Sequence, residues 1–354
     1  MTLRDNGVAV ERRAFIDRIG HGALAIGLGS GLGSARAAAE RASVTVQSYP
    51  GSLLNLPLHI GVDRKFFEAN GIKAVITPIP SGPLAQQALV AGDLDIAYGT
   101  SDPGIAAHAK GADTQIFLGL FNANIWGLVA RNGLPLPASG AGSYPGIMQS
   151  LKGVRVGVTG RGAASEFIVR SMFENAGMSG DSATYIAVGG PATAYPAMVT
   201  GTVDVVLAFE PVITLIDTQK TGRILVDLRK GEGPPALQQM NGAFVTFNAA
   251  RSFLQKNPQT VKAFQAGWIE SVKWMQDTAN RAAVGDFIKK YVSIGEASNM
   301  NAVLDRLISE NVKYFAWTVD PASITAYSEF LSKNKLIPGP VDPKRYVADV
   351  APRT

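Results

Sequence analysis

Short apolar runs and amphipathic segments alternate between residues 44 and 208, and the same alternation occurs twice. Each series predicts a strand, a helix, a strand, a helix and a strand. The predicted strands cover residues 44–48, 74–80 and 96–99 in the first series, and residues 154–158, 184–188 and 205–208 in the second. Strands that alternate with helices in this way are typical of parallel sheets covered by helices on both faces.

The two series also share short motifs at nearly the same spacing. The first helix of each ends in a Phe-Glu-x-x-Gly motif, at Gly71 and at Gly177, and a Gly-x-x-Asp motif at Gly92 and at Gly201 leads into each third strand. A glycine at a helix end takes the left-handed conformation without strain. We therefore predict an α/β protein of two lobes, each a mainly parallel sheet flanked by helices.

Two β-rich crossings are predicted to connect the lobes, at residues 125–130 and 242–248. After the second crossing the chain is helical, and three- and four-residue spacing of apolar residues places Trp268 in the core. The expected boundaries are residues 40–125 with 246–354 for lobe I, and residues 126–245 for lobe II. Two crossings form a hinge, and hinges of this kind close around ligands.

The first 39 residues have the features of a cleaved export signal. Arg12 and Arg13 precede a weakly hydrophobic, glycine-rich run at residues 19–32, and small residues around Ala37 and Ala39 fit a cleavage site. The paired arginines resemble the twin-arginine export signal. No cysteine follows the run, so we expect a soluble periplasmic protein without a lipid anchor.

Composition narrows the possible chemistry. The 354 residues include no cysteine and three histidines, so we expect neither disulfides nor a metal site, and no cofactor. The net charge is +5, with lysines and arginines scattered along the chain. A nucleic-acid-binding protein would concentrate its basic residues in a patch or stripe, so nucleic acid is not an expected partner.

The glycine-rich turn after the strand at residues 154–158 is the strongest candidate site. Gly160, Gly162 and Ser165 nearly match a dinucleotide-binding motif, but no acidic residue follows the next strand to hold a ribose. A helix that begins near Ala163 can instead bind an anion with its first N–H groups and positive dipole end. Arg161 is expected to add a bidentate contact to a carboxylate or sulfonate, unless it is a solvated surface arginine.

The other candidates follow the carboxyl ends of predicted strands, where ligands bind in α/β folds. Most are small polar residues at helix starts, for which helix capping is an alternative role. Trp126 could stack on a planar ligand or belong to the core, and Glu210 could face the cleft or cap a helix. The remaining ligand-binding candidates are Ser52, Asn55, Ser81, Gly82, Thr100, Ser101, Asn124 and Gly190.

In order and spacing, these motifs resemble those of periplasmic substrate-binding proteins of ABC importers. The resemblance is to the nitrate, sulfonate and taurine group, which shares its fold with thiamine-pyrimidine synthases. It rests on residues 61–72, 88–95, 151–157 and 197–204, with Glu210-Pro211 and Asn257-Pro258. It implies a type II periplasmic-binding-protein fold with a ligand clamped between the lobes and no catalysis.

The expected function is therefore delivery of a small anionic organic solute to an ABC permease and its ATPase, with the protein acting as a monomer. One alternative is a pyrimidine-synthase-like enzyme on the same fold. The resemblance would then imply a cysteine-rich motif, which a chain without cysteine cannot supply. The other alternative is a sensor that passes ligand occupancy to a membrane partner, and the sequence does not separate it from transport.

Overall fold

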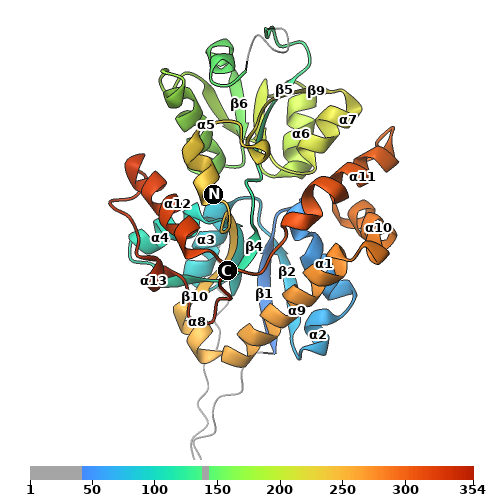
Figure 1. Ribbon diagram of the computed structural model, residues 1–354, viewed down its shortest axis with the longest axis vertical. Helices are drawn as coiled ribbons and strands as arrows, with labels where there is room; N and C mark the ends of the chain where they lie inside the picture. Colours follow the sequence, from blue (N-terminus) through green and yellow to red (C-terminus); the bar gives the residue numbers. More distant parts are fainter. Residues whose placement is uncertain (1–41, 138–142) are drawn as a thin grey trace, which may run out of the picture. The chain divides into compact units, whose positions relative to one another are not determined.

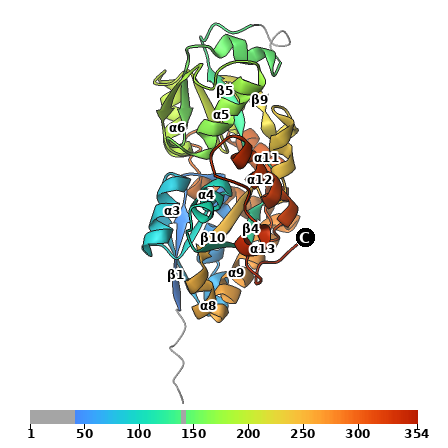
Figure 2. The same cartoon turned by 90° about the vertical axis from the view of Figure 1, so that its left-hand side faces the viewer.

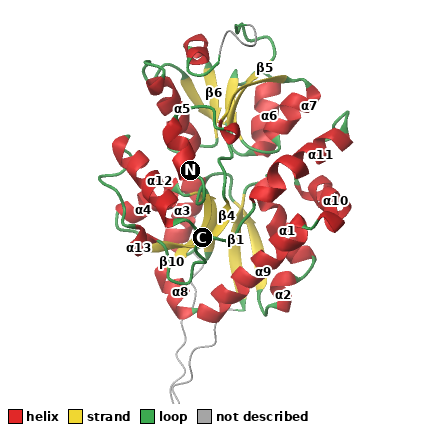
Figure 3. Cartoon of the chain, in the orientation of Figure 1, coloured by secondary structure: helices red, strands yellow, loops and turns green. Residues whose placement is uncertain are grey.

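In the computed structural model, residues 42–137 and 143–354 are described, and their strands form two five-stranded sheets (Figure 1). The first sheet has the order β2-β1-β3-β10-β4 and the second the order β7-β6-β8-β5-β9. Helices flank both sheets (Figure 3). The predicted α/β fold class is confirmed. The predicted export signal at residues 1–39 lies outside the described residues.

The two sheets repeat one topology. Four strands of each sheet run in the same direction, and the fourth strand in the sheet order, β10 or β5, is antiparallel to both of its neighbours. The first sheet contains β1 (Ser43–Ser48), β2 (Lys73–Pro78), β3 (Ile96–Thr100), β4 (Thr114–Phe121) and β10 (Val245–Ala250). The second contains β5 (Gly127–Arg131), β6 (Arg155–Val158), β7 (Thr184–Ala187), β8 (Val205–Ala208) and β9 (Gly222–Asp227).

The chain therefore passes twice between the sheets, through residues 122–126 and 228–244. We call residues 42–121 and 245–354 the first half, and residues 127–137 and 143–227 the second half. The apolar runs predicted as crossings are themselves sheet strands, β5 and β10. The reason is burial: each has its apolar residues enclosed between two neighbouring strands of its sheet.

Helices pack against both sheets, as Figure 2 shows for α3 and α4 in the first half and α5 and α6 in the second. The first half contains α1 (Leu56–Asp63), α2 (Phe66–Ala69), α3 (Gly82–Ala91), α4 (Asp102–Ala109), α8 (Arg251–Lys256), α9 (Pro258–Gln276), α10 (Arg281–Tyr291), α11 (Met300–Asn311), α12 (Pro321–Lys333) and α13 (Pro343–Tyr346). The second contains α5 (Ala164–Asn175), α6 (Pro191–Val199) and α7 (Val212–Gln219).

Short 3-10 helices complete the described structure: η1 (Leu53–Asn55), η2 (Gly146–Leu151), η3 (Leu228–Lys230), η4 (Pro235–Met240), η5 (Thr278–Asn280) and η6 (Val312–Tyr314). The apolar stripe of α9 faces the core, as its spacing predicts. Trp268 is fully buried, and its Nε1 donates a hydrogen bond of 2.9 Å to the carbonyl of Ala316. Within residues 42–137 and 143–354, no helix has the length and apolar character needed to cross a bilayer.

Candidate functional site

The loops at the carboxyl ends of the two sheets touch one another. The backbone N–H of Leu53 donates to the carbonyl of Glu210 at 3.3 Å. A Cβ atom on Gly160 would lie 3.4 Å from the Cβ atom of Ser81, and one on Gly190 would lie 3.8 Å from the carbonyl oxygen of Pro50. Each of these contacts joins the first half to the second, so the structure represents a closed arrangement.

Side-chain contacts from helices reinforce this closure. Arg306 on α11 forms an ion pair with Asp217 on α7. Ser298, which precedes α11, donates from its Oγ to Gln219 Oε1 at 2.8 Å. The rings of Phe167 on α5 and Phe330 on α12 have centroids 6.2 Å apart. The two halves therefore meet on several sides of the junction.

A narrow pocket lies at this junction, with an enclosed space of about 20 Å³. That is room for about one water molecule, so a larger ligand requires the halves to separate before it enters. Residues from both halves and from the first crossing line it. They are Tyr49, Leu54, Gly82, Pro83, Gly99, Thr100, Pro103, Ile125, Trp126, Thr159, Ala163, Ala164 and Phe209.

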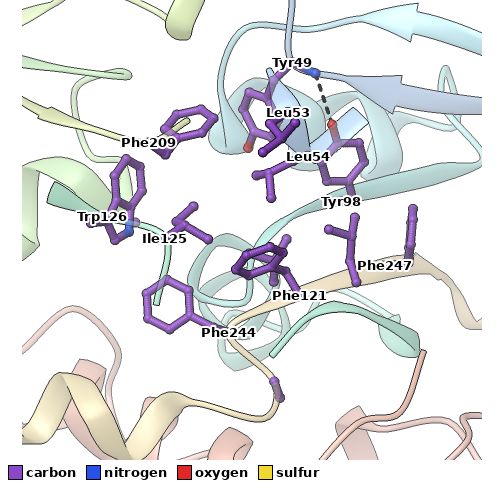
Figure 4. Close-up of a cluster of buried hydrophobic side chains, with 14 of the residues drawn as sticks. Tyr49, Leu53, Leu54, Tyr98, Phe121, Ile125, Trp126, Phe209, Phe244 and Phe247 are labelled. Carbon is purple, nitrogen blue, oxygen red and sulfur yellow. Dashed lines mark hydrogen bonds between the residues drawn. The ribbon is translucent and has the colours of Figure 1, made fainter. Parts of the chain in front are cut away.

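Three aromatic rings form one wall of the pocket (Figure 4). Phe209 follows β8, and its ring stands edge-on to those of Tyr49 and Trp126, with centroid distances of 5.9 and 5.2 Å. Edge-to-face pairs of this kind are favourable beyond the area they bury. Sequence reasoning missed Tyr49 and Phe209, although each directly follows a strand.

The predicted anion-binding turn contributes Ala163 to the pocket lining, together with Thr159 and Ala164. Ala163 is the N-cap residue of α5. Ser165 Oγ accepts a hydrogen bond of 2.9 Å from the N–H of Thr159, which fixes the turn against the helix. The start of a twelve-residue helix thus lies at the pocket, and the first N–H groups of a helix have no partner within it.

Arg161 does not line this pocket. Its Nε and Nη2 donate to the two carboxylate oxygens of Glu166 at 2.9 and 3.1 Å, and its side chain is 61% exposed. Burial raises the pKa of Glu166. Hydrogen bonds from Arg161, the N–H of Gly162 and Arg170 lower the same pKa by more than burial raises it, so it lies below its ordinary value. In this structure the guanidinium of Arg161 therefore binds the carboxylate of Glu166 on α5.

In the first half, Gly82 and Thr100 line the pocket and the other predicted residues lie around it. Ser81 is the N-cap residue of α3 and lies beside Gly160. The N–H groups of Leu54 and Tyr49 donate to Ser52 Oγ and Asn55 Oδ1, both at 3.1 Å, and Ser101 Oγ donates to the carbonyl of Ala243 at 2.7 Å. Ser52, Asn55 and Ser101 therefore stabilise the loops that carry the lining residues.

Glu210 is engaged by partners in the second half and in the second crossing. Its carboxylate accepts from Thr214 N and Oγ1 at 3.0 and 2.9 Å, and it pairs with Arg229 at 2.5 Å. Asn124 Oδ1 accepts from the N–H of Trp126 at 3.0 Å, which orders the crossing beside the pocket. Gly190 is the N-cap residue of α6 and lies opposite Pro50.

Asp102, also missed by sequence reasoning, lies buried at the start of α4 beside the lining residues Thr100 and Pro103. Burial raises its pKa to about 6, and hydrogen bonds from Thr100 and Tyr327 oppose that rise. Tyr327 donates to Asp102 Oδ1 at 3.0 Å. Ionisation of this carboxyl thus places a negative charge in an apolar setting near the pocket.

Asp102→Asn is expected to stabilise the fold at neutral pH. Because the folded-state pKa of about 6 lies above the ordinary 3.8, the stability of the native protein falls as pH rises between these values and stays lower above them. A neutral amide removes this penalty, on the order of 2 to 3 kcal/mol near pH 7, and keeps an acceptor for Tyr327. Urea unfolding near pH 4 and near pH 7 tests this, and an equal effect at both would contradict it.

Comparison with known protein families identifies the family of this chain. The profile of the NMT1-like family matches residues 38–289, which is more than half of the sequence. The chain belongs to the NMT1-like family. No curated protein matches it in a search by sequence.

Solved structures share the fold of this family member. The alkanesulfonate-binding protein SsuA of Xanthomonas axonopodis pv. citri, bound to MOPS, aligns with TM-score 0.69 and 17% identity over 88% of this chain and 99% of its own. The periplasmic aliphatic sulphonate binding protein SsuA of Escherichia coli gives 0.63 and 18% over 88% and 94%. The periplasmic nitrate-binding protein NrtA of Synechocystis PCC 6803 gives 0.58 and 17% over 76% and 70%. These neighbours are binding proteins, and the predicted periplasmic-binding-protein fold is confirmed.

Proposed function

We propose that this NMT1-like protein is the periplasmic solute-binding component of an ABC importer. It would clamp one small organic solute between its halves and deliver it to a membrane permease with its ATPase, acting as an exported monomer without catalysis. The observation that carries the proposal is the shared pocket: loops at the carboxyl ends of both sheets line it together and touch across it. A ligand held there contacts both halves, so binding energy favours closure.

The solute that we propose has an apolar body and an end rich in hydrogen-bond acceptors, such as a carboxylate or sulfonate. The pocket supplies the positive end of α5 at Ala163, while the hydroxyls of Thr100 and Thr159 contact Asp102 and Ser165. Of the lining residues described above, none carries a charge. N–H groups at the start of α5 would therefore hold the acidic end of the solute.

Native mass spectrometry of the exported chain tests this function. We expect one small molecule bound per chain, which is released on denaturation. Calorimetry with carboxylates and sulfonates should then give micromolar or tighter binding without any change in the ligand. Absence of a bound species together with no heat from a broad panel would contradict the proposal.

Two alternatives are weaker. A pyrimidine-synthase-like enzyme would convert its ligand, which mass analysis of the recovered molecule detects. A sensor would bind the same solute without transport. If a permease and ATPase are encoded beside this chain, stimulation of that ATPase by the liganded protein separates transport from sensing.

A further inference from the structure

Trp126 presents an unused hydrogen-bond donor at the pocket. Its side chain is 3% exposed and lines the space between the halves. Within the described part of the chain, Nε1 has no hydrogen-bond partner. A buried N–H without an acceptor is costly, and it is a feature that a bound molecule can correct.

The position of Trp126 is tightly fixed. Its backbone N–H donates to Asn124 Oδ1 at 3.0 Å, and its indole stands edge-on to Phe209 at an interplanar angle of 86°. The donor therefore does not depend on a mobile side chain. A ligand that binds at Trp126 therefore contacts aromatic rings whose orientation is already fixed.

Tyr49 completes this wall from the first half. A Cβ atom on Gly99 would lie 2.7 Å from the hydroxyl oxygen of Tyr49, and one on Gly82 would lie 3.3 Å from it. Both positions thus leave space for the tip of the phenol ring. Tyr49 and Phe209 stand edge-on at 79°, and both rings line the pocket together with Trp126.

The lining favours a solute with an apolar body over a small anion that has none. It contains no lysine, arginine or histidine among the residues described, and Arg161 is occupied by Glu166. An ion such as nitrate would lose its hydration without gaining a counter-charge, which is unfavourable. A flat ring, in contrast, replaces water with aromatic contacts.

We propose that the solute contains a planar aromatic ring that packs against Tyr49, Trp126 and Phe209, with an acceptor atom on or next to the ring that receives the Trp126 Nε1 hydrogen bond. This inference rests on the proposed function and names the class of its ligand. Because the space of about 20 Å³ in this closed arrangement holds about one water molecule, the ring enters while the halves are apart, and the halves then close around it less fully than they do here.

Pairs of ligands that differ only in having an aromatic or a saturated ring test whether the solute contains an aromatic ring. Calorimetry would compare benzenesulfonate with cyclohexanesulfonate, benzoate with cyclohexanecarboxylate, and butanesulfonate and nitrate as references. We expect at least one aromatic member to bind tenfold or more tightly than its saturated partner. Equal or tighter binding of the saturated partners, or binding of butanesulfonate or nitrate alone, overturns the aromatic class while the solute-binding function stands. If no compound binds and no molecule is recovered with the protein, both proposals fail.

Trp126→Phe tests the donor, because it keeps a ring and removes the N–H group. We expect tenfold weaker binding of the best aromatic ligand and a similar loss for its saturated partner, which carries the same acceptor group. The unliganded variant should unfold no more easily than Trp274→Phe, a control at a half-buried position on α9 that does not line the pocket. Unchanged affinity for both ligands would overturn the hydrogen bond to Nε1.

Discussion

Arg229→Ala is expected to destabilise the fold by about 3–5 kcal/mol, because it leaves the buried carboxylate of Glu210 without its counter-ion and that of Asp227 with Lys230 alone, at 3.5 Å. The Arg229 side chain is 11% exposed and pairs with Glu210 and Asp227, at 2.5 and 2.8 Å. Burial raises the pKa of Asp227, but hydrogen bonds and charge from Arg229 lower it below its ordinary value. Urea unfolding of the variant near neutral pH measures the loss.

The ion pair of Arg229 with Asp227 also predicts how the stability lost in Arg229→Ala depends on pH. A carboxyl whose folded-state pKa is lowered contributes stability at neutral pH, and that contribution disappears as pH falls through the folded-state value. The difference between the native protein and Arg229→Ala should therefore shrink below about pH 4, where carboxylates begin to protonate. Arg281→Ala is the control, since its partner Asp305 is exposed, and it should cost at most about 1 kcal/mol.

A loss for Arg229→Ala no larger than that of the control would contradict the buried network. A second substitution distinguishes charge from packing. Glu210→Gln in the Arg229→Ala background removes the unpaired charge of Glu210 and keeps an acceptor for Thr214. Partial recovery of stability is expected.

Gly160→Leu is expected to weaken ligand binding about ten- to a hundredfold while the chain remains folded. A Cβ atom there already lies 3.4 Å from Ser81 Cβ in the opposite half, so a longer side chain meets that half before closure is complete. Overfilling a packed junction costs about 1–3 kcal/mol, which corresponds to this range of affinity. Calorimetry with the best ligand of the panel measures it.

Gly146→Leu serves as the control for this prediction. Gly146 is exposed, and a Cβ atom on it would have no neighbour within 4 Å. The control should bind and unfold like the native protein, and Gly160→Leu should match it in thermal stability without ligand. If Gly160→Leu binds as tightly as the control, closure between Ser81 and Gly160 is not part of binding.

The strand pattern predicted the sheets because burial imposes it locally. Val156 and Val205, for example, lie in neighbouring buried strands of the second sheet, and both were predicted from apolar runs. The turn at Gly160 and Ala163 was likewise placed correctly at the start of α5. These features follow from short segments of sequence.

The chemistry of the pocket was harder to predict because it depends on partners. Arg161 lies in the loop just before α5 and pairs with Glu166 in the first turn of that helix, where Glu166 also accepts from the N–H of Gly162, and a capping pattern could have suggested this pairing. The edge-on contacts of Phe209 with Tyr49 and Trp126 join segments that lie far apart in the chain. No local pattern reveals them.

Closure around a solute is tested most directly by the distance between the halves. The chain has no cysteine, so spin labels attach only at two introduced cysteines, Val90→Cys on α3 and Val199→Cys on α6, both exposed positions. Pulsed electron paramagnetic resonance would measure the label separation with and without the tightest ligand. We predict a shorter, narrower distance distribution with ligand and a longer, broader one without it. Identical distributions in both states would contradict a binding protein that clamps its solute.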